Sequence, residues 1–117
     1  MVSAAYVPQR GDIVWIDFDP QAGHEQAGRR PALILSDKKY NARSSLVLLC
    51  PITSQFKPNP FVVALQPTLL PKPSYVLADQ VKSLDWRQRN PTFITRVPAI
   101  SVEDVTLFAV GIVQGRN

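Results

Sequence analysis

The sequence predicts a mainly β fold, a small barrel or strongly twisted sheet that carries one terminal helix. Short runs rich in β-branched and aromatic residues recur along most of the chain. Eleven prolines against five glycines in 117 residues favour short strands and stiff loops over a helical bundle. The hydrophobic period becomes helical only near the C-terminus. A chain of this length supports one core, so we expect a single domain over residues 1–117.

The predicted strands are β-rich segments bounded by turn residues. Gly11 precedes the first and Asp19-Pro20 closes it, while Pro31 begins the second, where a missing N–H costs least. The third is almost continuously apolar, so we expect it to be covered on both faces. The expected strands are 13–18, 31–36, 45–53, 60–65, 75–84 and 92–97, with a loop over 19–29.

Two segments are expected to be helical. The polar segment 37–44 predicts a short helical turn after the second strand. Near the C-terminus, apolar side chains follow helical spacing. Ser101 is expected to cap that helix, with Glu103 and Asp104 at its positive N-terminal end. The apolar positions are Val102, Val105, Phe108, Ala109, Ile112 and Val113.

Charge is unevenly distributed along the chain. The net charge is +4, and residues 20–96 hold eleven of the thirteen basic residues but only four of the nine acidic ones. A basic middle is what a polyanionic partner would require. The alternative is a solvated surface without a partner.

Composition excludes several classes of protein. No apolar run approaches the roughly 20 residues of a membrane span, and residues 1–10 lack the pattern of a signal peptide. Cys50 is the single cysteine, so we expect a reducing cytoplasm and an inert core thiol. His24 is the single histidine, which excludes a two-histidine mechanism and leaves too few ligands for a zinc site.

The candidate catalytic residues lie in the loop before the second strand and at the end of the third. Glu25 and Arg30 can supply a proton acceptor and a phosphate-binding fork, and Arg29 adds a second cation. The alternative is a solvated loop. Thr53 could donate a hydrogen bond to a phosphoryl oxygen, or it could be a strand-end residue satisfied by the backbone.

Two tryptophans are candidates for base stacking. Trp15 lies in the first strand and Trp86 lies beside basic residues. For Trp15, packing in the core is the alternative.

Several polar residues are further candidates for binding RNA or a metal. Gln80 and Lys82 follow a strand and could contact base edges or phosphates, and Arg87 lies in a basic turn. A polar strand face is the alternative for the first two. Asp17 and Asp19 could hold a metal, although two carboxylates at a strand end are more typical of a turn.

Three segments resemble the MazF/PemK family of toxin endoribonucleases. The first, residues 6–36, contains GD, FDP and G-x-EQ-x-G-x-RP in that order. The second, 51–61, contains PITSQ and NPF, and the third, 76–87, reads VLADQVKSLDWR. On these motifs, which span most of the chain, it is identified as a member of the family.

The resemblance implies an SH3-like β-barrel with short accessory helices, a homodimer, an acidic MazE-like antitoxin and sequence-specific cleavage of single-stranded RNA without metal or cofactor. It implies that Arg30 and Thr53 are catalytic and that Glu25 is the acidic residue of the EQ motif. Gln80 and Lys82 correspond to residues on the substrate side, and Trp15, Arg29 and Arg87 are further RNA-binding candidates. The proline-rich segment 66–74 and the valine-rich C-terminal helix depart from the family pattern.

The residues themselves are compatible with attack of an RNA 2′-hydroxyl on its own phosphate. Arg30 can stabilise the added negative charge, Thr53 can donate to a phosphoryl oxygen, and Glu25 could act as base. An arginine is a poor base because its guanidinium stays protonated. We therefore expect 2′,3′-cyclic phosphate and 5′-hydroxyl ends.

Two other functions use the same fold. One is a topoisomerase poison, but such proteins depend on a Trp-Gly-Ile ending and this chain ends Gln-Gly-Arg-Asn. The other is an RNA-binding module without activity, which the presence of Glu25, Arg30 and Thr53 disfavours.

Overall fold

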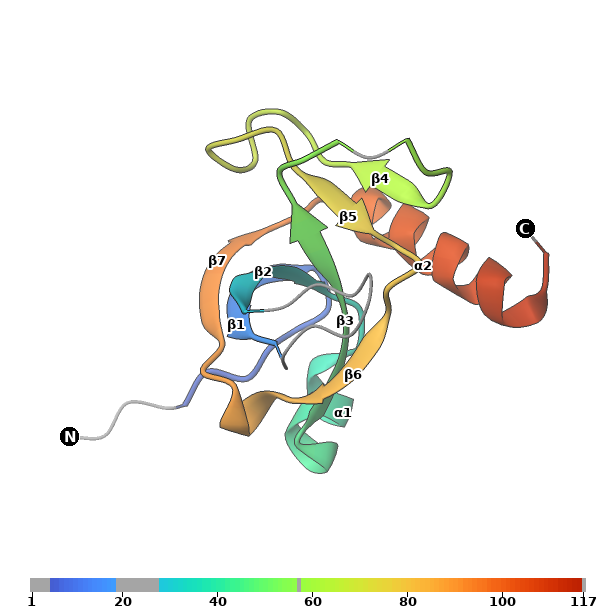
Figure 1. The fold of residues 1–117 in the computed structure, drawn as a ribbon. Helices are drawn as coiled ribbons and strands as arrows, with labels where there is room; N and C mark the ends of the chain where they lie inside the picture. The colour runs from blue at the N-terminus through green and yellow to red at the C-terminus, as the bar shows by residue number, and fades with distance from the viewer. Residues whose placement is uncertain (1–4, 19–27, 57, 117) are drawn as a thin grey trace.

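A curved antiparallel sheet of seven strands is the framework of the described part of the chain (Figure 1). The computed structural model describes residues 5–18, 28–56 and 58–116. The strands are β1 (Asp12–Asp17), β2 (Arg29–Ile34), β3 (Leu46–Thr53), β4 (Val62–Ala64), β5 (Tyr75–Leu77), β6 (Lys82–Asp85) and β7 (Thr92–Arg96). The helices are α1 (Lys38–Ser44), the 3₁₀ turn η1 (Trp86–Gln88) and α2 (Ala99–Gln114). The predicted fold class, mainly β with a C-terminal helix, is confirmed.

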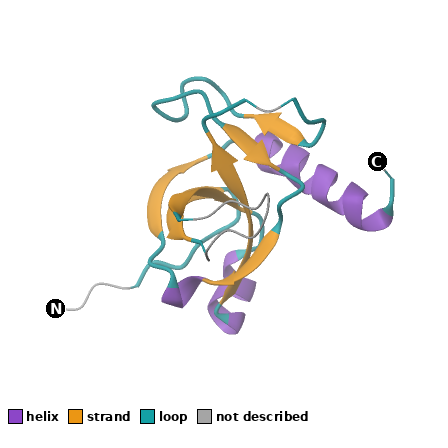
Figure 2. Cartoon of the chain, viewed as in Figure 1, coloured by secondary structure: helices purple, strands orange, loops and turns teal. Residues whose placement is uncertain are grey.

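The strand order is β4-β5-β3-β2-β1-β7, with β6 paired to β3. In the described pairings β4 and β7 are the two ends, so the sheet curves like a barrel without closing. The helices lie around the sheet, with α1 and η1 near one end and α2 beside β4 and β5 (Figure 2).

The longest strand, β3, organises the sheet. Along one edge its first half pairs with β6 and its last two residues pair with β5, while β2 occupies the other edge. The predicted strand 75–84 is therefore two strands on one edge of β3. The strand breaks because the Ala78 N–H donates to the Phe61 carbonyl and the Gln80 N–H donates to the Leu77 carbonyl, which forms a turn. Local hydrophobic alternation cannot predict this break, because it depends on pairing with residues that are distant in the sequence.

Two apolar clusters cover the sheet. One gathers residues of β1, β2, β3 and β5 with Val102 and Val105 of α2, and the other gathers the opposite-facing residues with Trp86. The second half of β3 is buried continuously, whereas Leu46 and Leu48 in its first half are exposed. Cys50 is fully buried, and burial raises the pKa of its thiol to about 12, so the expected inert core thiol is confirmed.

Helix α2 begins earlier than the sequence predicts. Pro98 is its N-cap residue, and the Ser101 N–H donates to the Pro98 carbonyl, so Ser101 is not the cap. No acidic residue lies in the first turn. Glu103 instead pairs with Arg10 at 3.3 Å, and Arg10 also donates to Thr106 at 2.9 Å. These bonds join α2 to the segment that precedes β1.

The predicted helical turn 37–44 is a true helix with a side-chain cap. Asp37 accepts hydrogen bonds from the N–H groups of Lys39 and Tyr40, as an N-cap residue should. The buried residue of this helix is Asn41, whose side-chain amide donates to the carbonyls of Pro8 and Ser36. None of the helices in the described ranges is long and apolar enough to cross a membrane.

Candidate active site

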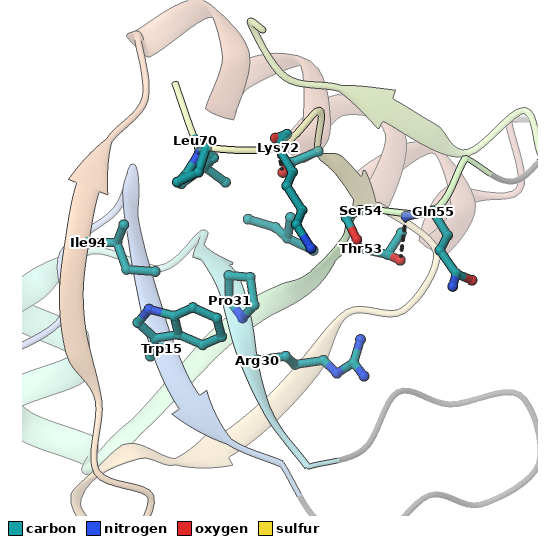
Figure 3. A pocket seen from close by; sticks show the side chains of 12 residues that line it. Trp15, Arg30, Pro31, Thr53, Ser54, Gln55, Leu70, Lys72 and Ile94 are labelled. Carbon is teal, nitrogen blue, oxygen red and sulfur yellow. Dashed lines mark hydrogen bonds between the residues drawn. The ribbon is translucent and has the colours of Figure 1, made fainter. Parts of the chain in front are cut away.

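A cleft of about 570 Å³ opens where β1, β2 and β3 meet the loop between β4 and β5 (Figure 3). Its apolar wall comes from Trp15, Pro31, Leu70 and Ile94. This volume lies in the range typical of ligand pockets, roughly 300–1,000 Å³.

The polar side of the cleft is formed by side chains from three elements. Arg30 comes from β2, Thr53 ends β3 and is followed by Ser54 and Gln55, and Lys72 extends from the loop (Figure 3). Of the described residues that line the cleft, two are basic and none is acidic. The cleft can therefore attract an anion.

The β2–β3 pairing brings Arg30 and Thr53 together although 22 residues separate them in the sequence. Ala32 faces Pro51 across the two strands. Beyond this pair the two strands continue to Arg30 and to Thr53, and both side chains line the cleft. The two catalytic candidates of the sequence thus occupy one cleft, on strands held by the core.

The Thr53 side chain both bonds the backbone and lines the cleft. It lines the cleft, and its Oγ1 accepts a hydrogen bond of 3.1 Å from the Gln55 N–H. That bond uses an oxygen lone pair and fixes the hydroxyl at the end of β3. The hydroxyl proton can still be donated.

The two tryptophans have different environments. Trp15 lies opposite Pro31 on β2, is 43% exposed and lines the cleft. Trp86 is buried, and its indole N–H donates to the Asn41 carbonyl at 2.9 Å. The interpretation of Trp86 as a base-stacking residue is therefore wrong, because its ring lies in the core.

Arg29 lies outside the cleft lining, although it adjoins Arg30. Its guanidinium donates to Asp17 at 3.1 Å and to Thr92 at 2.9 Å. Asp17 also accepts from Asn90, and this bond, followed by the one from Arg29, lowers the pKa of the Asp17 carboxyl. Asp17 is thus engaged at the strand end, and in the described ranges no cluster of three or more His, Cys, Asp or Glu side chains could hold a metal.

Arg87 packs against α1, away from the cleft. It donates to the Ser45 hydroxyl and to the Ala42 carbonyl, and it lies 4.4 Å from the centre of the Trp86 ring. These contacts stabilise the C-terminal end of α1.

The remaining sequence candidates fall in two places. Gln80 lies in the turn between β5 and β6 and Lys82 begins β6, both half-buried and outside the lining of the cleft. Glu25, His24 and Asp19 lie outside the described residues.

Lys72 is a cleft residue that the sequence reasoning did not single out, together with Leu70, Ser54 and Gln55. The segment 66–74 departs from the family pattern through its prolines, and none of its side chains is a candidate from sequence. The available signal was a basic residue between Pro71 and Pro73, in a loop that follows a predicted strand.

Comparison with known proteins gives concordant matches. Residues 9–107 match the family model described as PemK-like, MazF-like toxin of type II toxin-antitoxin system. The Endoribonuclease toxin MazF of Escherichia coli K12 is 48% identical over 87 residues, which is 74% of this chain and 77% of that protein. The crystal structure of MazF from Deinococcus radiodurans is 45% identical, with a TM-score of 0.86 over 95% of this chain and 99% of that one. A MazE–MazF complex from the same organism matches with 39% identity and a TM-score of 0.80, over 97% and 100% of the two chains.

Proposed function

Because this chain belongs to the PemK/MazF family of type II toxins, we propose that it is an endoribonuclease toxin that cleaves single-stranded RNA at specific sequences. The observation that carries the proposal is that Arg30 and Thr53 line the same basic cleft. We propose that residues 1–117 act as one toxin domain.

The proposed reaction is transesterification within the RNA. The 2′-oxygen forms a bond to the adjacent phosphorus, and the bond from phosphorus to the 5′-oxygen breaks. The 2′-hydroxyl loses its proton to a base, and the departing 5′-oxygen gains one. The products are a 2′,3′-cyclic phosphate and a 5′-hydroxyl, and neither a metal nor a cofactor takes part.

Arg30 is proposed to stabilise the negative charge that develops on the phosphoryl oxygens. A guanidinium can donate two parallel hydrogen bonds to such a group, and it retains its proton in proteins. Thr53 donates a further hydrogen bond from its fixed hydroxyl. Glu25, which precedes Arg30 by five residues, is the proposed base.

The bases of the RNA are proposed to contact the apolar wall. Trp15 presents an exposed ring beside Pro31, which suits stacking against a base. Gln80, Lys82 and Arg29 are proposed to bind RNA outside the lining of the cleft. Arg87 stays a prediction from sequence, since its described contacts serve α1.

A homodimer is proposed on the outer face of α2. Leu107 is 60% exposed and Val113 is 86% exposed, and a groove between α2 and the edge strand β4 is lined by Val62, Val63 and Phe108. An apolar helix face beside a strand edge that has no partner among the described strands suits a second copy of the chain. An acidic antitoxin is a proposed partner, because MazE–MazF complexes match this fold. We propose that it covers the basic cleft, since the charges are complementary.

Product analysis tests the proposed reaction. The purified protein is incubated with single-stranded RNA with and without EDTA, and the fragments are weighed by mass spectrometry. Cyclic phosphate ends in both samples support the proposal. A 5′-phosphate end, or cleavage only after magnesium is added, would indicate an activated water instead.

A matched oligonucleotide sharpens the test. A 2′-deoxy sugar immediately 5′ of the cleaved phosphate removes only the nucleophile. It should stop cleavage while binding is nearly unchanged.

A further inference from the structure

We propose that Lys72 is a substrate-binding residue that holds an RNA phosphate next to the one at Arg30. This inference rests on the proposed function and adds to it the part of the site contributed by the loop over residues 66–74. Lys72 lines the same cleft as Arg30 and extends into it from the opposite side (Figure 3).

The loop that carries Lys72 is closed at its base. The Leu65 N–H donates to the Ser74 carbonyl at 2.9 Å, at the junction with β4 and β5. The Ser74 hydroxyl donates to the Lys72 carbonyl, also at 2.9 Å, and Ser74 itself is buried. The backbone of Lys72 is thereby tied to the end of the sheet.

Apolar anchors and prolines restrict the rest of the loop. Leu69 and Leu70 pack against the core cluster that contains residues of β1, β2 and β3. Pro71 and Pro73 flank Lys72, and each fixes one backbone dihedral angle. The ammonium group therefore extends from a held backbone, and little backbone entropy is lost when it binds an anion.

The composition of the cleft identifies the ligand class. The two cationic side chains, Arg30 and Lys72, come from separate elements and line a cleft that also contains Trp15 and Thr53. No acidic residue is among the described lining residues. A lysine ammonium binds phosphate as a point charge, whereas the guanidinium of Arg30 provides a directional fork. Single-stranded RNA offers both a flat base for Trp15 and successive phosphates for the two cations.

The test measures salt-dependent binding, which is independent of cleavage. The probe is fluorescein-labelled single-stranded DNA of randomised sequence, which carries phosphates but no 2′-hydroxyl. Each phosphate contact on a single strand contributes about 0.7 to the slope of log affinity against log salt concentration. Lys72→Ala should therefore reduce that slope by about 0.7 and weaken binding about tenfold at low salt, whereas Lys72→Arg should retain the wild-type slope.

Lys39→Ala is the matched control, because this exposed lysine lies on α1 away from the cleft and its loss should leave the slope unchanged. On cleavable RNA, Lys72→Ala should raise KM more than it lowers kcat. If the wild type cleaves RNA but Lys72→Ala binds with the wild-type slope and affinity, this inference is overturned and the proposed function stands. If the wild type neither binds nor cleaves RNA, both fail.

Discussion

Replacing Thr53 by valine separates the proposed catalytic contribution of its hydroxyl from its structural contribution. Valine matches threonine in shape, so the buried end of β3 keeps its packing. The change removes one hydroxyl, which accepts a 3.1 Å hydrogen bond from the Gln55 N–H and is proposed to donate to the phosphate.

The two effects of Thr53→Val differ greatly in size. Gln55 is exposed, so water can replace the lost acceptor, and the free energy of unfolding should fall by about 1 kcal/mol or less. A domain of this length has a stability of roughly 6–17 kcal/mol, so the variant stays folded. Loss of a donor to the developing negative charge should slow cleavage by about 10²–10³-fold.

Single-turnover cleavage of a fluorogenic RNA and urea denaturation measure the two effects on the same preparation. Thr53→Ser is the matched control, because it retains the hydroxyl and loses only a methyl group. A folded Thr53→Val protein that cleaves within about threefold of the wild-type rate would refute the proposed role of the hydroxyl.

Three other predictions follow from the described contacts. Asn41→Leu removes a fully buried amide that satisfies two carbonyls and a hydroxyl, so urea denaturation should show a loss of about 3 kcal/mol, and a loss under 1 kcal/mol would contradict this. Asp17 has a lowered pKa in the folded state, so its contribution to stability is present above the ordinary value of 3.8 and is lost as pH falls through the lowered one. Denaturation midpoints of wild type and Asp17→Asn should therefore converge in acid, and a constant difference would count against the carboxylate contacts. Leu107→Asp places a charge on the exposed face of α2, so light scattering should show a shift from dimer to monomer with the circular dichroism unchanged, and a persistent dimer would place the interface elsewhere.

Most of the strands could be predicted from sequence because their signals are local. β1 and β7 match the predicted segments to within a residue at each end, and β2 is displaced by two, starting at Arg29. The start of α2 could not be predicted in the same way. Ser101 with nearby acidic residues resembles a capping motif, but Pro98 ends the extended segment and its carbonyl accepts the first bonds of the helix.

The two tryptophans show where local pattern stops being informative. Each lies among apolar and charged neighbours that permit either burial or exposure. Trp86 is buried because Asn41, 45 positions earlier, offers it a carbonyl acceptor. Trp15 is exposed because its side of β1 faces the cleft. Lys72 was missed for the same reason, since only tertiary anchoring of its loop brings it to the site.

The polar residues of the cleft are held in two ways, some by strands of the sheet and one by a loop. Arg30 and Thr53 project from neighbouring strands of one sheet, and Thr53 also pairs with Tyr75 on β5, so the positions of their backbones are set by the core. Lys72 projects from a loop whose ends are fixed but whose length and sequence can change without altering the sheet. Chemistry at the phosphate tolerates little displacement, whereas the choice of RNA sequence depends on contacts farther along the strand. The proposed division between catalytic residues on strands and a binding residue on a loop would let the recognised sequence change while the reaction stays the same. An exchange of segment 66–74 with that of a relative should accordingly alter which RNA is cut and leave the chemical ends of the products unchanged.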